Sequence, residues 1–247
     1  MRLHRFYINQ NIVAGKEIRI EDSELLNQWG RVFRLEAGDE VILFNDSDYE
    51  FTAKFSLLSK KEAVLDILDS KKAVEEVLKE LHIFQSIIKK DNFELIVQKC
   101  TEIGASAFHP IISERSEKKN LNMERLLKIA KEASEQSGKV KLPKISEPEK
   151  LEKSIENFDG ELFTLDFDGE PFSSLRGVCD EANHPLDCHA PLAMTGKIGI
   201  LIGPEGGWSD KEREFFKQKG IKNISLGNQV LRAETAAIAI ASLILLG

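Results

Sequence analysis

Three side chains that could take part in catalysis stand close together near the end of the chain, at Arg232, Glu234 and Thr235. A guanidinium can stabilise negative charge that develops during a reaction, a carboxylate can accept a proton, and a hydroxyl can donate or accept a hydrogen bond. They come just before a predicted helix over residues 236–246, where a cation opposes the helix dipole. A purely structural role for Arg232 is therefore less favoured, and a surface ion pair with Glu234 is the alternative.

A glycine-rich turn with the sequence Gly-Pro-Glu-Gly-Gly-Trp-Ser occupies residues 203–209. It follows an apolar run over residues 198–202, which predicts a buried strand. It precedes Ser209 and Glu212, whose spacing is that of a capping box at the start of a helix. Turns between a strand and a helix are where open α/β sheets hold ligands, and glycines let the backbone approach the ligand closely.

The residues of this turn argue against a phosphate ligand. A P-loop ends in Gly-Lys-Ser or Gly-Lys-Thr, and neither this ending nor the Gly-x-Gly-x-x-Gly fingerprint is present. The carboxylate of Glu205 would repel a phosphate and suits a neutral or cationic ligand. A tight turn without a ligand is the alternative.

A second glycine-bearing loop supports the ligand interpretation. Residues 226–235 read Leu-Gly-Asn-Gln-Val-Leu-Arg-Ala-Glu-Thr, after a predicted strand over residues 221–226. Two such loops at the carboxyl ends of neighbouring strands can form the two sides of one crevice. Arg232 would then face a ligand rather than only its neighbour Glu234.

These two loops resemble the signature of the RsmE family, and further matching segments cover nearly the whole chain. The additional matches occur in the order His4-Arg5-Phe6, Arg31-Val32-Phe33-Arg34-Leu35, Gly38-Asp39, residues 94–104, 110–116 and 128–130, and Glu135-Gln136-Ser137-Gly138. Several matches in the right order are more specific than one loop.

The resemblance implies a methyltransferase of the knotted SPOUT superfamily that uses S-adenosylmethionine (SAM) and modifies N3 of a uridine in 16S ribosomal RNA of the small subunit. It implies a PUA-like RNA-binding β-barrel, a trefoil knot, and a homodimer with the C-terminal helix at its interface. Arg232, Glu234 and Thr235 are the catalytic candidates. The expected cofactor-binding residues are Leu165, Gly203, Glu205, Gly206, Leu226, Gly227 and Leu231, and the expected RNA-binding residues are Arg5, Arg31, Arg34 and Arg115.

Some positions depart from the family pattern, namely Gln28, Lys90-Asp91-Asn92, Gln229 and Ala233. Gln229 and Ala233 affect the expected details of RNA contact. Two alternatives therefore stay open, a SPOUT ribose 2′-O-methyltransferase and a non-catalytic RNA-binding factor in ribosome assembly.

Composition predicts a globular protein of the cytoplasm. The three cysteines cannot all pair, and no secretory signal or membrane-spanning run is recognisable. The net charge of −7 is unusual for an RNA-binding protein, so any basic surface must be local. The spacing of Cys179, His184, Cys188 and His189 matches no common zinc pattern. We therefore expect a surface loop there and no metal site.

The hydrophobic pattern predicts an α/β fold in two domains. Residues 1–70 are expected to form the small β-barrel, with strands over 41–44 and 51–57. The charged residues 71–80 are expected to form a linker. Residues 81–247 alternate strands with helices, which favours a parallel α/β domain. Its strands are expected at 81–88, 107–112, 161–167, 198–202 and 221–226, and its helices around 93–103, at 123–137 and at 236–246, the last one buried on all sides.

Overall fold

The structure is a computed structural model that describes residues 3–73, 79–116, 120–172 and 196–246. The chain forms two compact units. The first comprises Met1–Glu76 with Ser134–Leu142, and the second comprises Val77–Ala133 with Pro143–Gly247. The strand β5 continues to Lys72 and β6 begins at Lys79, so strands extend into both ends of the predicted linker. The predicted domain boundaries stay predictions.

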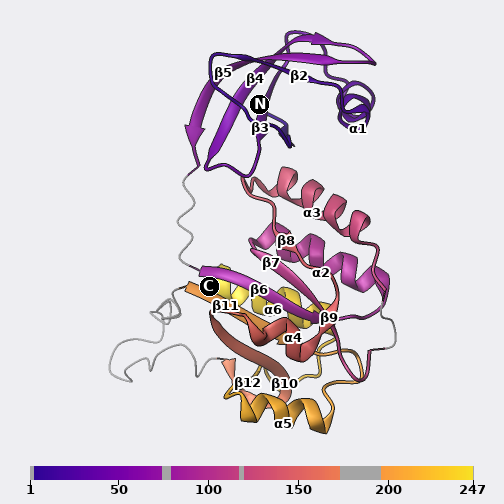
Figure 1. Ribbon diagram of the computed structural model, residues 1–247, viewed down its shortest axis with the longest axis vertical. Coiled ribbons are helices and arrows are strands. Elements are labelled where there is room, and N and C mark those ends of the chain that lie inside the picture. The colour runs from indigo at the N-terminus through magenta and orange to yellow at the C-terminus, as the bar shows by residue number, and fades with distance from the viewer. Residues whose placement is uncertain (1–2, 74–78, 117–119, 173–195, 247) are drawn as a thin grey trace. The chain divides into compact units, whose positions relative to one another are not determined.

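The first unit is built on a five-stranded sheet in the order β1-β3-β4-β5-β2 (Figure 1). The pairing of β1 with β3 is parallel, and the other pairings are antiparallel. The strands are β1 (Arg5–Tyr7), β2 (Glu17–Ile20), β3 (Glu40–Phe44), β4 (Tyr49–Leu58) and β5 (Ala63–Lys72). A short helix α1 (Ser23–Asn27) and a π-helical turn η1 (Gln28–Val32) complete it.

Aromatic residues fill the core of this first unit. Trp29 from η1 is fully buried and packs edge-on against Phe6 and Phe55, with ring centroids 5.6 Å and 5.1 Å apart. The sequence pattern predicts Phe51, Ala53, Phe55 and Leu57 on one face of β4, and the first three are buried. Leu57 is 42% exposed, so the prediction is wrong there, because the pairing register of β4 shifts between Phe55 and Leu57.

The second unit contains a parallel sheet of seven strands, which confirms the predicted α/β class. Its order is β12-β10-β11-β6-β7-β8, and β9 also pairs with β7. All of these pairings are parallel. The strands are β6 (Lys79–Ser86), β7 (Ala107–Ile112), β8 (Lys144–Ile145), β9 (Glu149–Lys150), β10 (Glu161–Pro171), β11 (Gly196–Ile202) and β12 (Lys222–Ser225). The knot stays a prediction.

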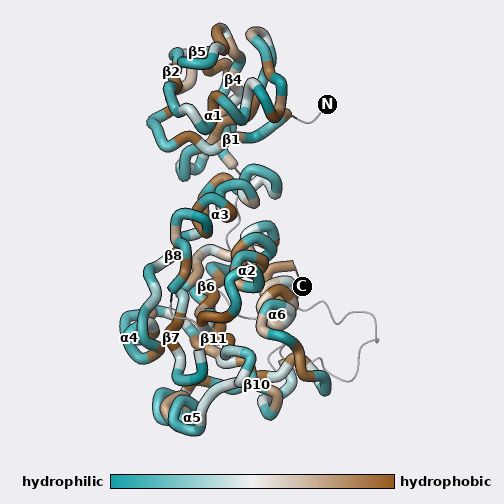
Figure 2. Tube along the Cα trace, turned by 90° about the vertical axis from the view of Figure 1, so that its right-hand side faces the viewer, coloured by the Kyte–Doolittle hydropathy of each residue, from teal (hydrophilic) through white to brown (hydrophobic). Residues whose placement is uncertain are grey.

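Helices cover both faces of this sheet. They are α2 (Lys90–Ile103), α3 (Met123–Ser137), α4 (Leu151–Glu156), α5 (Asp210–Gln218) and α6 (Ala233–Leu245). Figure 2 shows the hydrophobic strands β6 and β11 between α4 and α6. Side chains alternate accordingly along the strands: Ile200 packs in the cluster that contains residues of α2 and α6, and Leu201 packs in the cluster that contains residues of α4 and α5. This period of two is expected for a sheet buried on both faces.

The C-terminal helix differs from its prediction in two ways. It starts at Ala233 rather than at residue 236, so Glu234 and Thr235 belong to its first turn. It is also not buried on all sides, because Ile238 and Leu243 are half-buried although they are as apolar as the buried Ile240 and Ile244. The sequence pattern could not distinguish the two faces, since both are apolar. No helix among the described residues is both long and apolar enough to cross a membrane.

Candidate cofactor pocket and active site

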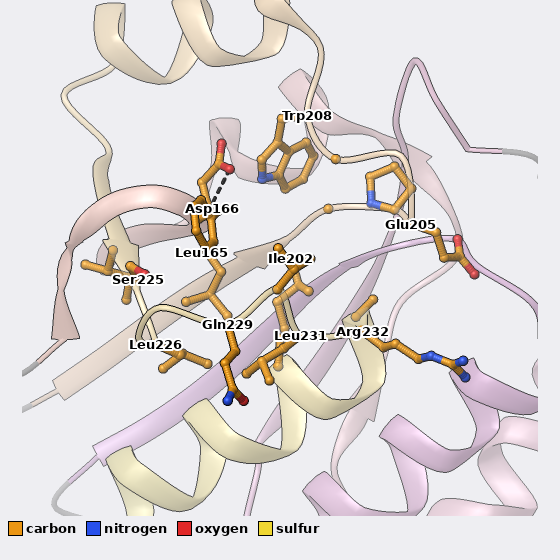
Figure 3. Close-up of a pocket in the computed structure, with 18 residues that line it drawn as sticks. Leu165, Asp166, Ile202, Glu205, Trp208, Ser225, Leu226, Gln229, Leu231 and Arg232 are labelled. Atoms are coloured by element: carbon orange, nitrogen blue, oxygen red, sulfur yellow. Dashed lines mark hydrogen bonds between the residues drawn. The ribbon is translucent and has the colours of Figure 1, made fainter.

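A cavity of about 300 Å³ lies at the carboxyl ends of β11 and β12 and beside residues 165–167 in the middle of β10. Its walls include Leu165, Ile202 and Leu226, together with the loops that follow β11 and β12 (Figure 3). The carboxyl edge of a parallel sheet is where open α/β folds bind ligands. A cavity of this size is at the lower end of the range for small-molecule sites.

The two loops predicted from the sequence both line this cavity. The loop after β11, which we call the glycine loop, comprises residues 203–209, and the loop after β12, which we call the arginine loop, comprises residues 226–232. Of the expected cofactor-binding residues, the structure places five in the lining: Leu165, Gly203, Glu205, Leu226 and Leu231. Gly206 and Gly227 are exposed and do not line it.

Of the three catalytic candidates, only Arg232 lines the cavity. It is the N-cap residue of α6 and is exposed, and within the described part of the chain its guanidinium has no hydrogen-bond or ion-pair partner. In Figure 3 it extends from the start of α6 away from Leu226 and Asp166. The proposed surface pair between Arg232 and Glu234 is thus not formed.

The Glu234 and Thr235 side chains do not line the cavity, because the helix turns them away from the face that does. Ala233 and Ala236 line the cavity, and residues three apart share one face of a helix. Glu234 and Thr235 therefore lie on other sides of the first turn. Glu234 is only 8% exposed, and its Oε2 has no hydrogen-bond partner among the described residues, while Thr235 is exposed.

The structure adds two residues that the sequence interpretation did not include. Asp166 follows Leu165 in β10 and lines the cavity, and Arg213 of α5 holds its carboxylate through Nη2 at 3.0 Å from Oδ2. Trp208 forms another wall, is 2% exposed, and its Nε1 has no partner within the described residues. A signal for Asp166 was present, since it lies near the end of a third predicted strand.

Local sequence explains how the glycine loop is shaped. Ser209 accepts a hydrogen bond from the Glu212 amide, and Glu212 accepts one from the Ser209 amide at 2.8 Å, which confirms the predicted capping box. Gly207 has a φ of +67°, a conformation that favours glycine, and its amide donates to the Pro204 carbonyl at 2.8 Å.

The segment Ser113–Ser116 after β7 also contacts the glycine loop. The Arg115 guanidinium donates to the Gly206 and Trp208 carbonyls. A hydrogen bond from Ser209, together with Lys211 and Arg115, holds the pKa of the exposed Glu114 carboxyl below its ordinary value.

The remaining arginines expected to bind RNA lie in the first unit. The Arg5 side chain is only 8% exposed and pairs with Glu50 at 2.5 Å, and it also donates to the Gly138 and Lys139 carbonyls. Arg31 and Arg34 are exposed. Arg34 has a φ of 53°.

Metal binding has no structural support in the described residues, because no group of three or more His, Cys, Asp or Glu there is arranged to hold an ion. Cys179, His184, Cys188 and His189 lie outside the described residues.

Comparison with known proteins connects this geometry to a family. A family model described as an RNA methyltransferase domain matches residues 75–245, and one described as an RNA methyltransferase PUA domain matches residues 30–68. A ribosomal RNA small subunit methyltransferase E from Rickettsia conorii is 31% identical over 250 residues, which covers 100% of this chain and 97% of that protein. The chain belongs to the ribosomal RNA small subunit methyltransferase E family. The resemblance to RsmE proteins is therefore confirmed.

Two solved structures share the fold of this chain. A Legionella pneumophila protein in complex with the bound cofactor SAM is 27% identical, with a TM-score of 0.84, over 99% of this chain and 97% of that chain. A ribosomal RNA small subunit methyltransferase E from Neisseria gonorrhoeae, bound to S-adenosyl methionine, shares the fold with a TM-score of 0.79 at 24% identity, over 98% of this chain and 96% of that chain.

Proposed function

We propose that this protein transfers a methyl group from SAM to N3 of a uridine in 16S ribosomal RNA of the small ribosomal subunit. The observation that carries the proposal is the cavity between the glycine loop and the arginine loop, with the unpartnered Arg232 in its lining. Membership of the methyltransferase E family supports the reaction, and the SAM complex of the Legionella relative supports the cofactor.

The residues of the cavity fit SAM. Apolar side chains such as Leu165, Ile202 and Leu226 suit an adenine ring, and the carboxylates of Asp166 and Glu205 suit a ligand that carries positive charge. The buried and unpartnered Trp208 Nε1 leaves a donor in one wall. When bound, SAM supplies a methyl group activated by its sulfonium charge. We propose that the expected cofactor-binding residues, including Gly206 and Gly227, hold it largely through main-chain groups.

Arg232 stabilises the negative charge on the uracil ring in this proposal. Removal of the N3 proton spreads charge onto the two ring oxygens, and a fixed cation next to them lowers the barrier. Because Arg232 has no partner among the described residues, its donors are available to a substrate. The chain also has to hold the nitrogen in line with the methyl group, and positioning of this kind removes several kcal/mol from a barrier.

Glu234 is the proposed proton acceptor or orienting group, and Thr235 the proposed hydrogen-bond partner of the substrate. A buried carboxylate oxygen without a hydrogen bond is costly, so a partner that arrives with the substrate would stabilise Glu234. Its side chain lies outside the cavity lining and does not pair with Arg232, so either role requires a group that arrives with the substrate.

The proposed RNA partner is recognised by the β-rich first unit and by exposed cations such as Arg31 and Arg34. The target base has to leave its stack to reach the cavity. A homodimer is proposed because the half-buried face of α6, with Ile238 and Leu243, remains apolar. Action on ribosomal subunits implies a cytoplasmic protein.

The decisive experiment measures incorporation of labelled methyl from SAM into small ribosomal subunits that lack the modification. Nuclease digestion and mass spectrometry then identify the product, and we expect N3-methyluridine. A ribose-methylated nucleoside would instead indicate the 2′-O-methyltransferase alternative. No incorporation by a chain that binds the subunit would indicate a non-catalytic assembly factor.

A further inference from the structure

One carboxylate joins the segment Ser113–Ser116 to the glycine loop. Glu212 is 6% exposed, and its Oε1 accepts a hydrogen bond from the Glu114 amide at 3.0 Å while its Oε2 accepts one from the Ser209 amide at 2.8 Å. A buried carboxylate that accepts backbone hydrogen bonds holds both donors firmly. The segment after β7 therefore has a defined position beside the glycine loop.

Because the segment is held there, the Arg115 side chain lies against the glycine loop. Its Nη1 donates to the Gly206 carbonyl at 2.8 Å and to the Trp208 carbonyl at 3.2 Å. A Cβ placed on Gly206 would lie 3.6 Å from the Arg115 Cδ and 3.7 Å from its Cβ, so the side chain follows the loop closely. The guanidinium thus joins the two carbonyls on either side of Gly207.

The two carbonyls belong to the part of the loop that shapes the cavity. Gly207 and Trp208 both line it, and Gly207 has the left-handed φ of +67°. Without Arg115, the two carbonyls would have to find other hydrogen-bond donors, and the exposed turn around Gly207 would gain conformational freedom. A ligand that contacts this wall would then bind more weakly, because binding would have to order the loop.

Arg115 and Arg232 differ in the hydrogen bonds of their guanidinium groups. Arg232 has no partner in the described part of the chain, whereas one terminal nitrogen of Arg115 is already used by two backbone acceptors. The expected role of Arg115 as an RNA-binding cation would fall to Nε and Nη2 alone, on a side chain whose direction the two carbonyls already fix. The observed contacts favour a different role.

We propose that Arg115 is a positioning residue for the cofactor: it holds the Gly206 and Trp208 carbonyls so that the glycine loop keeps the shape that admits SAM, and it makes no contact with RNA phosphate. This inference rests on the proposed function for the identity of the ligand.

The test compares the full-length protein with its Arg115→Ala and Arg115→Lys variants in two separate binding measurements. SAM affinity is measured by titration calorimetry without RNA. RNA affinity is measured with a fragment of 16S ribosomal RNA over a range of salt concentrations. Arg125→Ala is the matched control, because Arg125 is exposed and the described contact of its guanidinium is with Glu94, away from the glycine loop.

We expect Arg115→Ala to weaken SAM binding about tenfold, since a charge-assisted hydrogen bond contributes on this order. RNA affinity and its salt dependence should not change. Steady-state kinetics should show a raised KM for SAM with kcat retained at saturation. Arg115→Lys should recover only part of the SAM affinity, because an ammonium lacks the planar geometry of the guanidinium. Arg125→Ala should match the unmodified protein in both measurements.

The opposite pattern would overturn the proposal. A phosphate contact predicts unchanged SAM affinity, weaker RNA binding and a salt slope smaller by about one. Any fall in the salt slope of Arg115→Ala counts against the proposal, even if SAM binding also weakens. If Arg115→Ala does not fold, Arg115→Lys carries the test with the same readouts. An unmodified protein that does not bind SAM would contradict the proposed function instead.

Discussion

The two loops that line the cavity are built in different ways. The glycine loop is held by bonds to a distant segment: Arg115 donates to two of its carbonyls, and Glu212, which accepts from the Ser209 amide, also accepts from the Glu114 amide. The indole of Trp208 is 2% exposed and packs against Phe216. In the arginine loop, the described contacts are local. Ser225 Oγ donates to the Gly227 carbonyl and accepts from its amide.

The arginine loop is also the more exposed of the two loops. Residues Gly227 to Val230 are all exposed, and the Val230 side chain is 84% exposed. A loop that is already ordered loses little entropy when a ligand binds, whereas an exposed loop keeps its side chains available for a second molecule. We infer that the glycine loop is prepared for the cofactor and that the exposed residues of the arginine loop, which also lines the cofactor cavity, serve the RNA.

The largest expected effect concerns the arginine loop. Arg232→Ala should lower the rate of methyl transfer by about 10³-fold, or roughly 4 kcal/mol, because removal of one preorganised donor has this effect in other active sites. SAM affinity, measured by calorimetry, should change little. Arg125→Ala, which removes an exposed arginine that pairs with Glu94, is the control. A fully active Arg232→Ala variant would remove this residue from the mechanism.

A smaller effect is expected in the glycine loop from Gly203→Ala. The new Cβ would lie 3.3 Å from Cε2 of Trp208 and 3.4 Å from Cδ2 and Nε1, and the ring cannot move freely because it is buried. We expect about 1 to 3 kcal/mol of lost stability, as for other overpacked sites, and weaker SAM binding. Thermal unfolding and calorimetry measure the two.

Gly206→Ala is the matched control for this substitution. Its Cβ would have ordinary contacts of 3.6 Å and 3.7 Å with flexible methylenes of Arg115, so the stability of the protein should be nearly unchanged. If Gly203→Ala and Gly206→Ala unfold at the same temperature, the glycine loop is not as rigid as we infer.

Hydrogen exchange compares the two loops without any substitution. In the free protein, the amides of Gly207 and Ser209 should exchange slowly, because they donate to the Pro204 carbonyl and to Glu212. The exposed amides of residues 228–230 should exchange fast. Addition of RNA should slow exchange mainly in the arginine loop. Equal protection of both loops in the free protein would contradict the comparison.

A change of pH is expected to have the smallest effect on the comparison, because the two histidines concerned lie in the sheet and in neither loop. His82 in β6 and His109 in β7 have ring nitrogens 3.0 Å apart. Burial and the proximity of His82 lower the pKa of His109 to about 4. Below pH 6.5 the unfolded chain therefore binds a proton that the folded chain does not, and stability falls as the pH drops from 6.5 to about 4.

We expect this acid effect to be about 1 to 2 kcal/mol, after allowance for the partial solvent screening of the pair. Urea unfolding at pH 7 and pH 5 measures it, and His109→Gln should flatten the dependence. A pH dependence that is unchanged in His109→Gln would show that other groups cause it.

Much of the fold could be predicted because its signals are local. The bounds of β7 and α3 agree with the hydrophobic period, and α2 ends where Gly104 permits a φ of +122°. The short strands β1, β2, β8 and β9 could not be predicted in the same way, since their pairing depends on residues far away in the sequence.

The site shows the same division between local and distant signals. The glycine loop and Arg232 were recognisable from spacing alone. The contacts of Arg115 with the glycine loop join residues 91 and 93 positions apart, so its isolated sequence context indicated only a basic surface. The pairing of Asp166 with Arg213, 47 positions away, was hidden for the same reason.

The most direct test of the central claim is a crystal structure of this protein in complex with SAM. We expect one SAM molecule in the cavity between the glycine loop and the arginine loop, in contact with Leu165 and Leu226, with its methyl group directed toward the space beside Arg232. SAM bound at any other place, or the two loops too far apart to contact it together, would contradict the account.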